Sequence, residues 1–134
     1  MNMDRSSYTT IAVPSDEMER VRATLENLLG IKMDGVASGA WGDYYATPNR
    51  PLPVISVFQN MKSDEDGDYW NEDDYREYPL LISIDDERTP DLLNSMISKI
   101  LSDSELGAVL VRKNFWDENG NGVDEDGNLI ETTK

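Results

Sequence analysis

The pattern of apolar and polar residues predicts that the first half of the chain folds as a strand, a helix and three further strands. Tyr8 to Val13 is β-branched and aromatic, as strands are. Ser15 and Asp16 can cap a helix that Gly30 would end. Apolar residues recur between them at steps of three and four, namely Met18, Val21, Leu25, Leu28 and Leu29. The three further strands are expected at residues 31–36, 41–47 and 54–59.

The second half repeats this order. Leu80 to Ile84 predicts a strand, and Pro90 stands at a favoured first position of a helix that Thr89 can cap. The apolar stripe of this helix is Leu93, Met96, Ile97, Ile100 and Leu101. A strand is expected at 108–111, at most a short one within 114–124, and a final one at 128–132. Two such units, each with an apolar sheet face, would bury those faces together.

An acidic segment separates the two halves. Residues 63–77 hold eight carboxylates and one arginine. Mutual repulsion and low hydrophobicity predict an exposed loop here. We therefore expect a single domain spanning residues 1–134, with a first module at about 7–60, an acidic loop at 61–78 and a second module at about 79–134.

The composition excludes several kinds of chemistry. The chain has no histidine and no cysteine, so a Ser-His-Asp triad, a His-ligated metal and a disulfide framework are excluded. The formal net charge of −15 repels nucleic acid and anionic membranes and attracts cations or basic proteins. No apolar run is long enough to span a membrane, and the polar start lacks the apolar region of a signal peptide. A cytoplasmic protein is expected.

Four segments, in order, resemble motifs of the vicinal oxygen chelate superfamily, which includes glyoxalases, bleomycin-resistance proteins and ring-opening dioxygenases. They are Ile11-Ala12-Val13-Pro14 through Leu28-Leu29-Gly30-Ile31, Leu81 to Asp86, Leu92 to Gly107 with the Ala-Val-Leu-Val that follows, and Val123 to Glu131. The resemblance implies an α+β fold in which two βαβββ modules form a curved mixed sheet around a cleft.

The resemblance also bears on metal binding. Its metal-ligand positions fall near Thr10, Pro79 and Glu131, and only Glu131 is a residue that can serve as such a ligand. One carboxylate cannot hold a divalent metal in a three-residue site. No metal and no cofactor are therefore expected, and Glu131 becomes a candidate for ligand contact.

Aromatic residues beside carboxylates suggest a binding site for a small molecule. Aromatic faces and carboxylates together suit a planar cationic ligand, although some of these aromatics must pack in the core. The candidate residues are Trp41, Tyr45, Phe58, Trp70, Trp116 and Glu131. Bleomycin-resistance proteins are acidic, metal-free members of the superfamily that sequester such a drug between subunits. The resemblance thus implies a homodimeric sequestering protein, as in antibiotic resistance.

Three functions remain open on the sequence. The first is this metal-free binder of a cationic or aromatic small molecule. The second is a lyase or dioxygenase of the same superfamily with a displaced metal site built from carboxylates such as Glu131, Asp43 or Asp85. The third is an acidic interaction or inhibitor protein, in which the run from Asp64 to Glu77 masks the basic surface of a partner.

Overall fold

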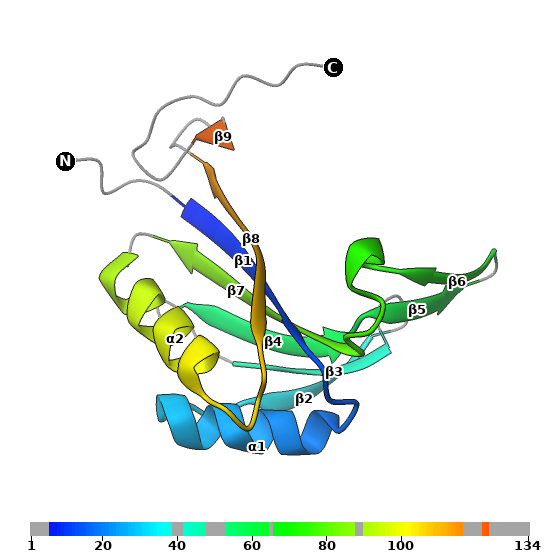
Figure 1. Cartoon of the computed structure of the whole chain (residues 1–134), viewed down its shortest axis with the longest axis horizontal. Helices are drawn as coiled ribbons and strands as arrows, with labels where there is room; N and C mark the ends of the chain where they lie inside the picture. The colour runs from blue at the N-terminus through cyan, green and yellow to red at the C-terminus, as the bar shows by residue number, and fades with distance from the viewer. Residues whose placement is uncertain are drawn as a thin grey trace.

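The computed structural model describes residues 6–38, 42–47, 53–64, 66–87, 90–116 and 122–123. In this part of the chain a seven-stranded sheet carries both helices on one face (Figure 1). In sheet order the strands are β2 (Asp34–Ser38), β3 (Gly42–Ala46), β4 (Val54–Gln59), β7 (Leu80–Glu87), β1 (Ser6–Val13), β8 (Val109–Trp116) and β9 (Gly122–Val123). The helices are α1 (Met18–Leu29) and α2 (Pro90–Ser102). The expected α+β class is confirmed.

The main core lies between the sheet and the two helices. Alternate residues of each central strand point to the helices, for example Leu80, Ile82 and Ile84 of β7, and all three are buried. The other face of the sheet has a smaller cluster around Ala12, Phe58 and Leu81. β1, β4 and β7 therefore contribute apolar residues to clusters on both faces of the sheet.

The two helices follow the predicted stripes with local differences. Gly30 ends α1 in the left-handed conformation, as expected, with φ of 65°. The residue preceding α1 is Glu17 rather than Ser15 or Asp16, and Ser15 instead accepts a hydrogen bond from the Glu17 amide through Oγ (3.1 Å). In α2 the stripe is buried except for Leu101, which is 37% exposed because it lies at the edge of the apolar arc.

Strand boundaries and directions also depart from expectation. The strand expected at 31–36 begins at Asp34, because the Met33 amide donates to the Glu26 carboxylate (2.8 Å) and holds a turn there. The resemblance implies a mixed sheet, but every pairing among the described strands is antiparallel. β8 continues to Trp116, beyond the expected Val111. The strand expected at 128–132 lies outside the described residues.

The largest correction concerns the segment expected to be an exposed loop. Residues 61–78 contain a hairpin of β5 (Met61–Asp64) and β6 (Gly67–Trp70), followed by a short 3₁₀ helix, η1 (Asp73–Tyr75). We call residues 61–78 the acidic arm. It leaves the sheet at the end of β4 and returns at the start of β7 (Figure 1). Its attachment to the sheet depends largely on one residue that the composition does not single out.

Asn60 is fully buried and binds the acidic arm through its side chain and its backbone. Its Nδ2 donates to the carbonyl oxygens of Tyr75 (2.9 Å) and Tyr78 (3.0 Å), and more weakly to that of Glu72 (3.4 Å). Its Oδ1 accepts from the Glu72 amide (2.8 Å). In the backbone, the Asn60 amide donates to Pro79 (2.8 Å) and its carbonyl accepts from Asn71 (2.7 Å). These bonds attach the part of the acidic arm that follows the hairpin to the end of β4.

We expect Asn60→Ala to lower the free energy of unfolding by about 3 kcal/mol, because it leaves peptide groups of the acidic arm without their buried partner. Asn71→Ala is the matched control, since its side chain makes an exposed hydrogen bond to the Gln59 carbonyl (3.0 Å) and should cost less than about 1 kcal/mol. Urea unfolding followed by tryptophan fluorescence measures both. Equal losses in the two variants would contradict this role of Asn60.

Candidate functional site

The acidic arm presents charge and apolar surface together. In its described residues, exposed carboxylates come from the hairpin and from around η1, namely Asp66, Asp68, Asp73, Asp74 and Glu77. The hairpin also exposes two large apolar side chains, Tyr69 (45%) and Met61 (43%). The whole arm holds eight acidic residues against two basic ones, Lys62 and Arg76. It is therefore an anionic surface that also offers aromatic and thioether contacts.

Contacts beyond Asn60 fix the arm on the sheet. Glu72, whose side chain is only 13% exposed, forms an ion pair with Arg112 of β8, forty residues away in sequence. Tyr75 and Tyr78 pack on the smaller core cluster around Phe58, with their ring centroids 5.8 Å apart. Arg76 donates to Asp73 (2.8 Å from Nε) within the exposed end of the arm. One side of the arm is thus attached to the sheet, while Asp66, Asp68, Asp73, Asp74 and Glu77 are exposed.

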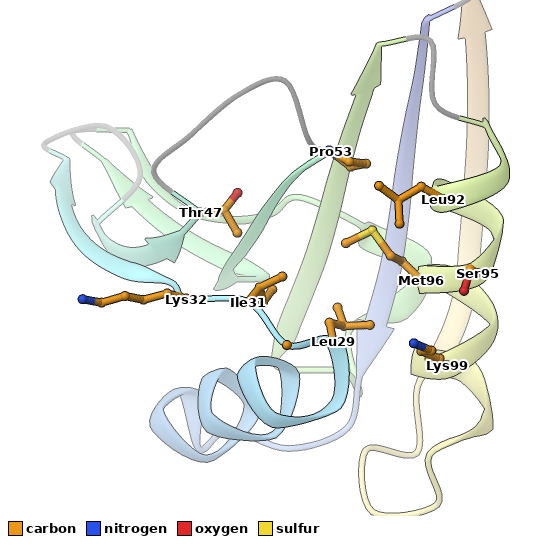
Figure 2. A pocket seen from close by; sticks show the side chains of 10 residues that line it. Leu29, Ile31, Lys32, Thr47, Pro53, Leu92, Ser95, Met96 and Lys99 are labelled. Carbon is orange, nitrogen blue, oxygen red and sulfur yellow. The ribbon is translucent and has the colours of Figure 1, made fainter.

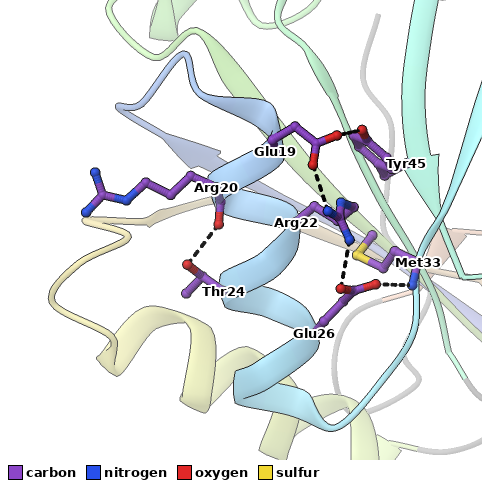
Figure 3. Close-up of polar contacts among 7 residues, drawn as sticks. All are labelled: Glu19, Arg20, Arg22, Thr24, Glu26, Met33 and Tyr45. Carbon is purple, nitrogen blue, oxygen red and sulfur yellow. Dashed lines mark hydrogen bonds and ion pairs between the residues drawn. The ribbon is translucent and has the colours of Figure 1, made fainter.

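A second site lies on the helix side, at Tyr45 of β3. A hollow of about 540 Å³ is lined there by Met18, Glu19, Tyr44, Tyr45 and Gln59, together with part of β2. The Tyr45 hydroxyl donates to the Glu19 carboxylate, and Glu19 also accepts from Arg22 (2.7 Å; Figure 3). Aromatic rings and a carboxylate therefore meet in one hollow, as a cationic aromatic ligand requires.

Arg22 already contacts the aromatic ring and the carboxylate that a cationic ligand would use. The Arg22 guanidinium lies 5.0 Å from the centroid of the Tyr45 ring and also pairs with Glu26 (2.8 Å). The hydrogen bonds from Tyr45 and Arg22 lower the pKa of Glu19, and the same Glu19 carboxylate raises the pKa of the Tyr45 phenol. The Glu19 hydrogen bond likewise raises the pKa of Arg22. A cationic ligand would have to displace Arg22 to bind here.

The structure disperses the aromatic residues proposed from the sequence. Tyr45 packs on the helix-covered face, whereas Phe58 lies in the cluster on the opposite face. Trp70 is half-buried in the acidic arm, opposite Met61. Trp116 pairs with Ser6 at one end of β1, whereas Ala12, the β1 residue in the Phe58 cluster, lies near the other end. Trp41 and Glu131 lie outside the described residues.

Several residues of these two sites could not be found from sequence patterns. Asn60 and Arg112 have no local signal, because their partners lie 12 to 40 residues away. Glu19 and Arg22 do have a helical i, i+3 spacing, but that spacing alone predicts only an exposed ion pair. The contact of Glu19 with Tyr45 crosses 26 residues and depends on the tertiary fold.

Metal and membrane signals are absent within the described residues. No group of three or more acidic side chains in this part of the chain is placed to hold a metal ion. Asp85 is half-buried in β7, while the side chain of Asp43 and all of Glu131 lie outside the description. No helix among the described residues is long and apolar enough to cross a membrane.

No family model matches the chain, and comparison with curated proteins also gave no match.

The linked groups at Tyr45 should give opposite pH effects at the two ends of the scale. Because the folded pKa of Glu19 is lowered, its stabilising effect is present above the unfolded carboxyl pKa of about 4.3 and is lost as the pH falls through the folded value. The raised pKa of Tyr45 gives stability that is present below about pH 10 and is lost as the pH rises through the folded value.

Urea unfolding of the wild type and of Tyr45→Phe across this range tests the linkage. The stability difference between them should be largest near neutral pH and should shrink in acid and in alkali. Glu19→Gln should also shift one tyrosine to a lower pKa in an ultraviolet absorbance titration, and Tyr45→Phe should remove that tyrosine. A stability difference that does not change with pH would contradict the coupling.

Proposed function

We propose that the chain is an acidic binding protein that uses the acidic arm to dock on a basic surface of a partner protein, as an inhibitor that masks such a surface does. The observation that carries the proposal is the firm attachment of the most acidic segment to the sheet. Residues 61–78 contain eight carboxylates that repel one another. Nevertheless, the hairpin strands pair with each other, and Asn60 and Arg112 hold the segment that follows them, Glu72 to Tyr78, against the sheet.

Preorganisation of this kind favours binding. A surface that is already ordered loses little conformational entropy on association, so more of the interaction energy appears as affinity. The concentrated negative field also steers a basic partner and raises the association rate. A disordered acidic loop would carry the same charge but would lose more conformational entropy on binding.

The partner's chemistry follows from the side chains of the arm. Carboxylates on both sides of the exposed Tyr69 suit lysine and arginine side chains, and the tyrosine ring adds contact area and a cation–π face. Met61 is exposed on the neighbouring strand and adds an adaptable apolar contact. A basic protein surface with some apolar area therefore fits the arm better than a purely charged polycation does.

Charge neutralisation tests this proposal. Purified protein is immobilised, and captured proteins are eluted by a salt gradient. We expect basic proteins to elute from the wild type and to be lost from a variant with Asp66→Asn, Asp68→Asn, Asp74→Asn and Glu77→Gln. The matched control removes four exposed carboxylates elsewhere, with Glu17→Gln, Asp34→Asn, Asp91→Asn and Glu105→Gln, and should retain them. Equal loss in both variants would show a general polyanion effect and overturn the proposal.

Tyr69→Ser separates contact from steering. Because it removes aromatic area without changing the charge, it should weaken capture of the same partner while leaving the salt dependence unchanged. Full retention of binding would leave the exposed aromatic without the proposed role.

A second candidate is the small cationic aromatic ligand expected from the sequence. It is favoured by the hollow in which Tyr44, Tyr45 and Glu19 meet. Since Arg22 competes for the same ring and carboxylate, Arg22→Met should bind cationic aromatic antibiotics more tightly than the wild type does in calorimetric titrations. Tyr45→Ala in the same background should abolish the gain. No heat from either protein across the panel would remove this candidate.

Membership of the vicinal oxygen chelate superfamily stays a prediction. The order β1-α1-β2-β3-β4 followed by β7-α2-β8-β9 supports two related modules. Their layout differs, however, because β8 pairs directly with β1 whereas β2 lies at the sheet edge, beyond β3 and β4. The homodimer and the cytoplasmic location expected from the sequence also stay predictions.

A further inference from the structure

A separate hollow, which we call the interhelical pocket, lies between the end of α1 and one side of α2 (Figure 2). Its volume of about 370 Å³ is within the range of small-molecule sites, roughly 300–1,000 Å³. Its walls are mainly apolar and include Leu29, Ile31, Pro53, Leu92 and Met96. Leu92 remains 39% exposed beside it, which is unusual for a leucine so close to the core.

The charge of this pocket is opposite to that of the rest of the chain. None of its lining residues is acidic, although Asp and Glu make up 27 of the 134 residues of the protein. Two lysines line it instead, Lys32 after α1 and Lys99 in α2. Neither lysine forms an ion pair with another residue in the described parts of the chain. The pocket is therefore apolar with cations at its edges.

Hydrogen bonds hold its walls in place. The Glu26 carboxylate binds both Arg22 (2.8 Å) and the Met33 amide (2.8 Å), which fixes the turn that contains Ile31 and Lys32. Beside this turn, Thr47 accepts from the Ile55 amide through Oγ1 (3.0 Å). The shape of the pocket is thus set before any ligand arrives.

We propose that the interhelical pocket binds a small anionic amphiphile, a monocarboxylate with an apolar body of medium length. The body lies against Leu29, Leu92 and Met96, and the carboxylate lies at the Ser95 hydroxyl and the Lys99 ammonium. This site is independent of the acidic arm and selects the opposite charge.

The position of the carboxylate follows from the two helices. Ser95 and Lys99 are four residues apart, so they share one side of α2 and can contact the same group. Lys32 follows the C-terminal end of α1, where the helix dipole disfavours an anion. Its side chain also points away from the apolar walls, whereas Lys99 lies near them (Figure 2). Lys99 is therefore the anchor, and Lys32 contributes only through its distant charge.

Three ligands of one chain length test the charge preference by isothermal titration calorimetry. They are decanoate, decanol and decylammonium, each kept below its micellar concentration. We expect decanoate to bind most tightly and decylammonium least. Tighter binding of decylammonium, or no decanoate binding, would overturn the proposal.

Variants then locate the site. Lys99→Gln should weaken decanoate binding about fivefold and leave decanol unchanged, whereas Lys32→Gln should have less than half that effect. Leu92→Trp should block the pocket. Leu101→Trp, at another exposed leucine of the same helix, is its control and should bind normally. Unchanged binding in both Lys99→Gln and Leu92→Trp would place any bound decanoate elsewhere and reject the site.

Discussion

The buried carboxamide of Asn60 is the interaction on which the acidic arm depends. A chain segment with this many carboxylates gains little from its own hairpin, since two isolated strands are marginally stable and the charges repel. One side chain with two donor protons and an acceptor binds three consecutive parts of the arm, around Glu72, Tyr75 and Tyr78. Removed from water, these bonds are strong and directional, and breaking any one leaves a polar group unpaired. The Arg112–Glu72 ion pair then attaches the same segment to β8.

The charge of the molecule is distributed unevenly, and this unevenness links the two proposed sites. Acidic residues concentrate in the arm, at the junction of β4 and β7, while the interhelical pocket is free of them. Along α1, Arg22 lies between Glu19 and Glu26 and pairs with both, and this network joins the helix to β3 and to the turn before β2 (Figure 3). The overall charge of −15 has the same sign as the local charge of the arm but the opposite sign to the local charge of the pocket. The electric field at a binding site depends mainly on nearby groups.

The sequence predicted what depends on local periodicity and missed what depends on distant partners. Both helices and β1, β3, β4 and β7 were found because their apolar residues recur with the period of the element. The hairpin of the arm was missed because its strands are short and mainly polar, so no apolar alternation indicates them. The aromatic site was assembled from composition, which carries no information on which face of the sheet Tyr45 and Phe58 occupy. Alternation along β3 and β4 assigns each face only once the pairing is known.

The position of the arm in the topology has one further consequence. β4 and β7 are neighbours in the sheet, and Gln59 pairs with Leu80, so the whole of residues 61–78 is an enlarged loop between two adjacent antiparallel strands. Such an insertion changes neither the order of the strands nor the core beneath the helices. The scaffold can thus be inherited while the recognition segment is exchanged, with Asn60 and its acceptors as the joint that any replacement must satisfy. Diversity among related chains is accordingly expected to be concentrated in this loop.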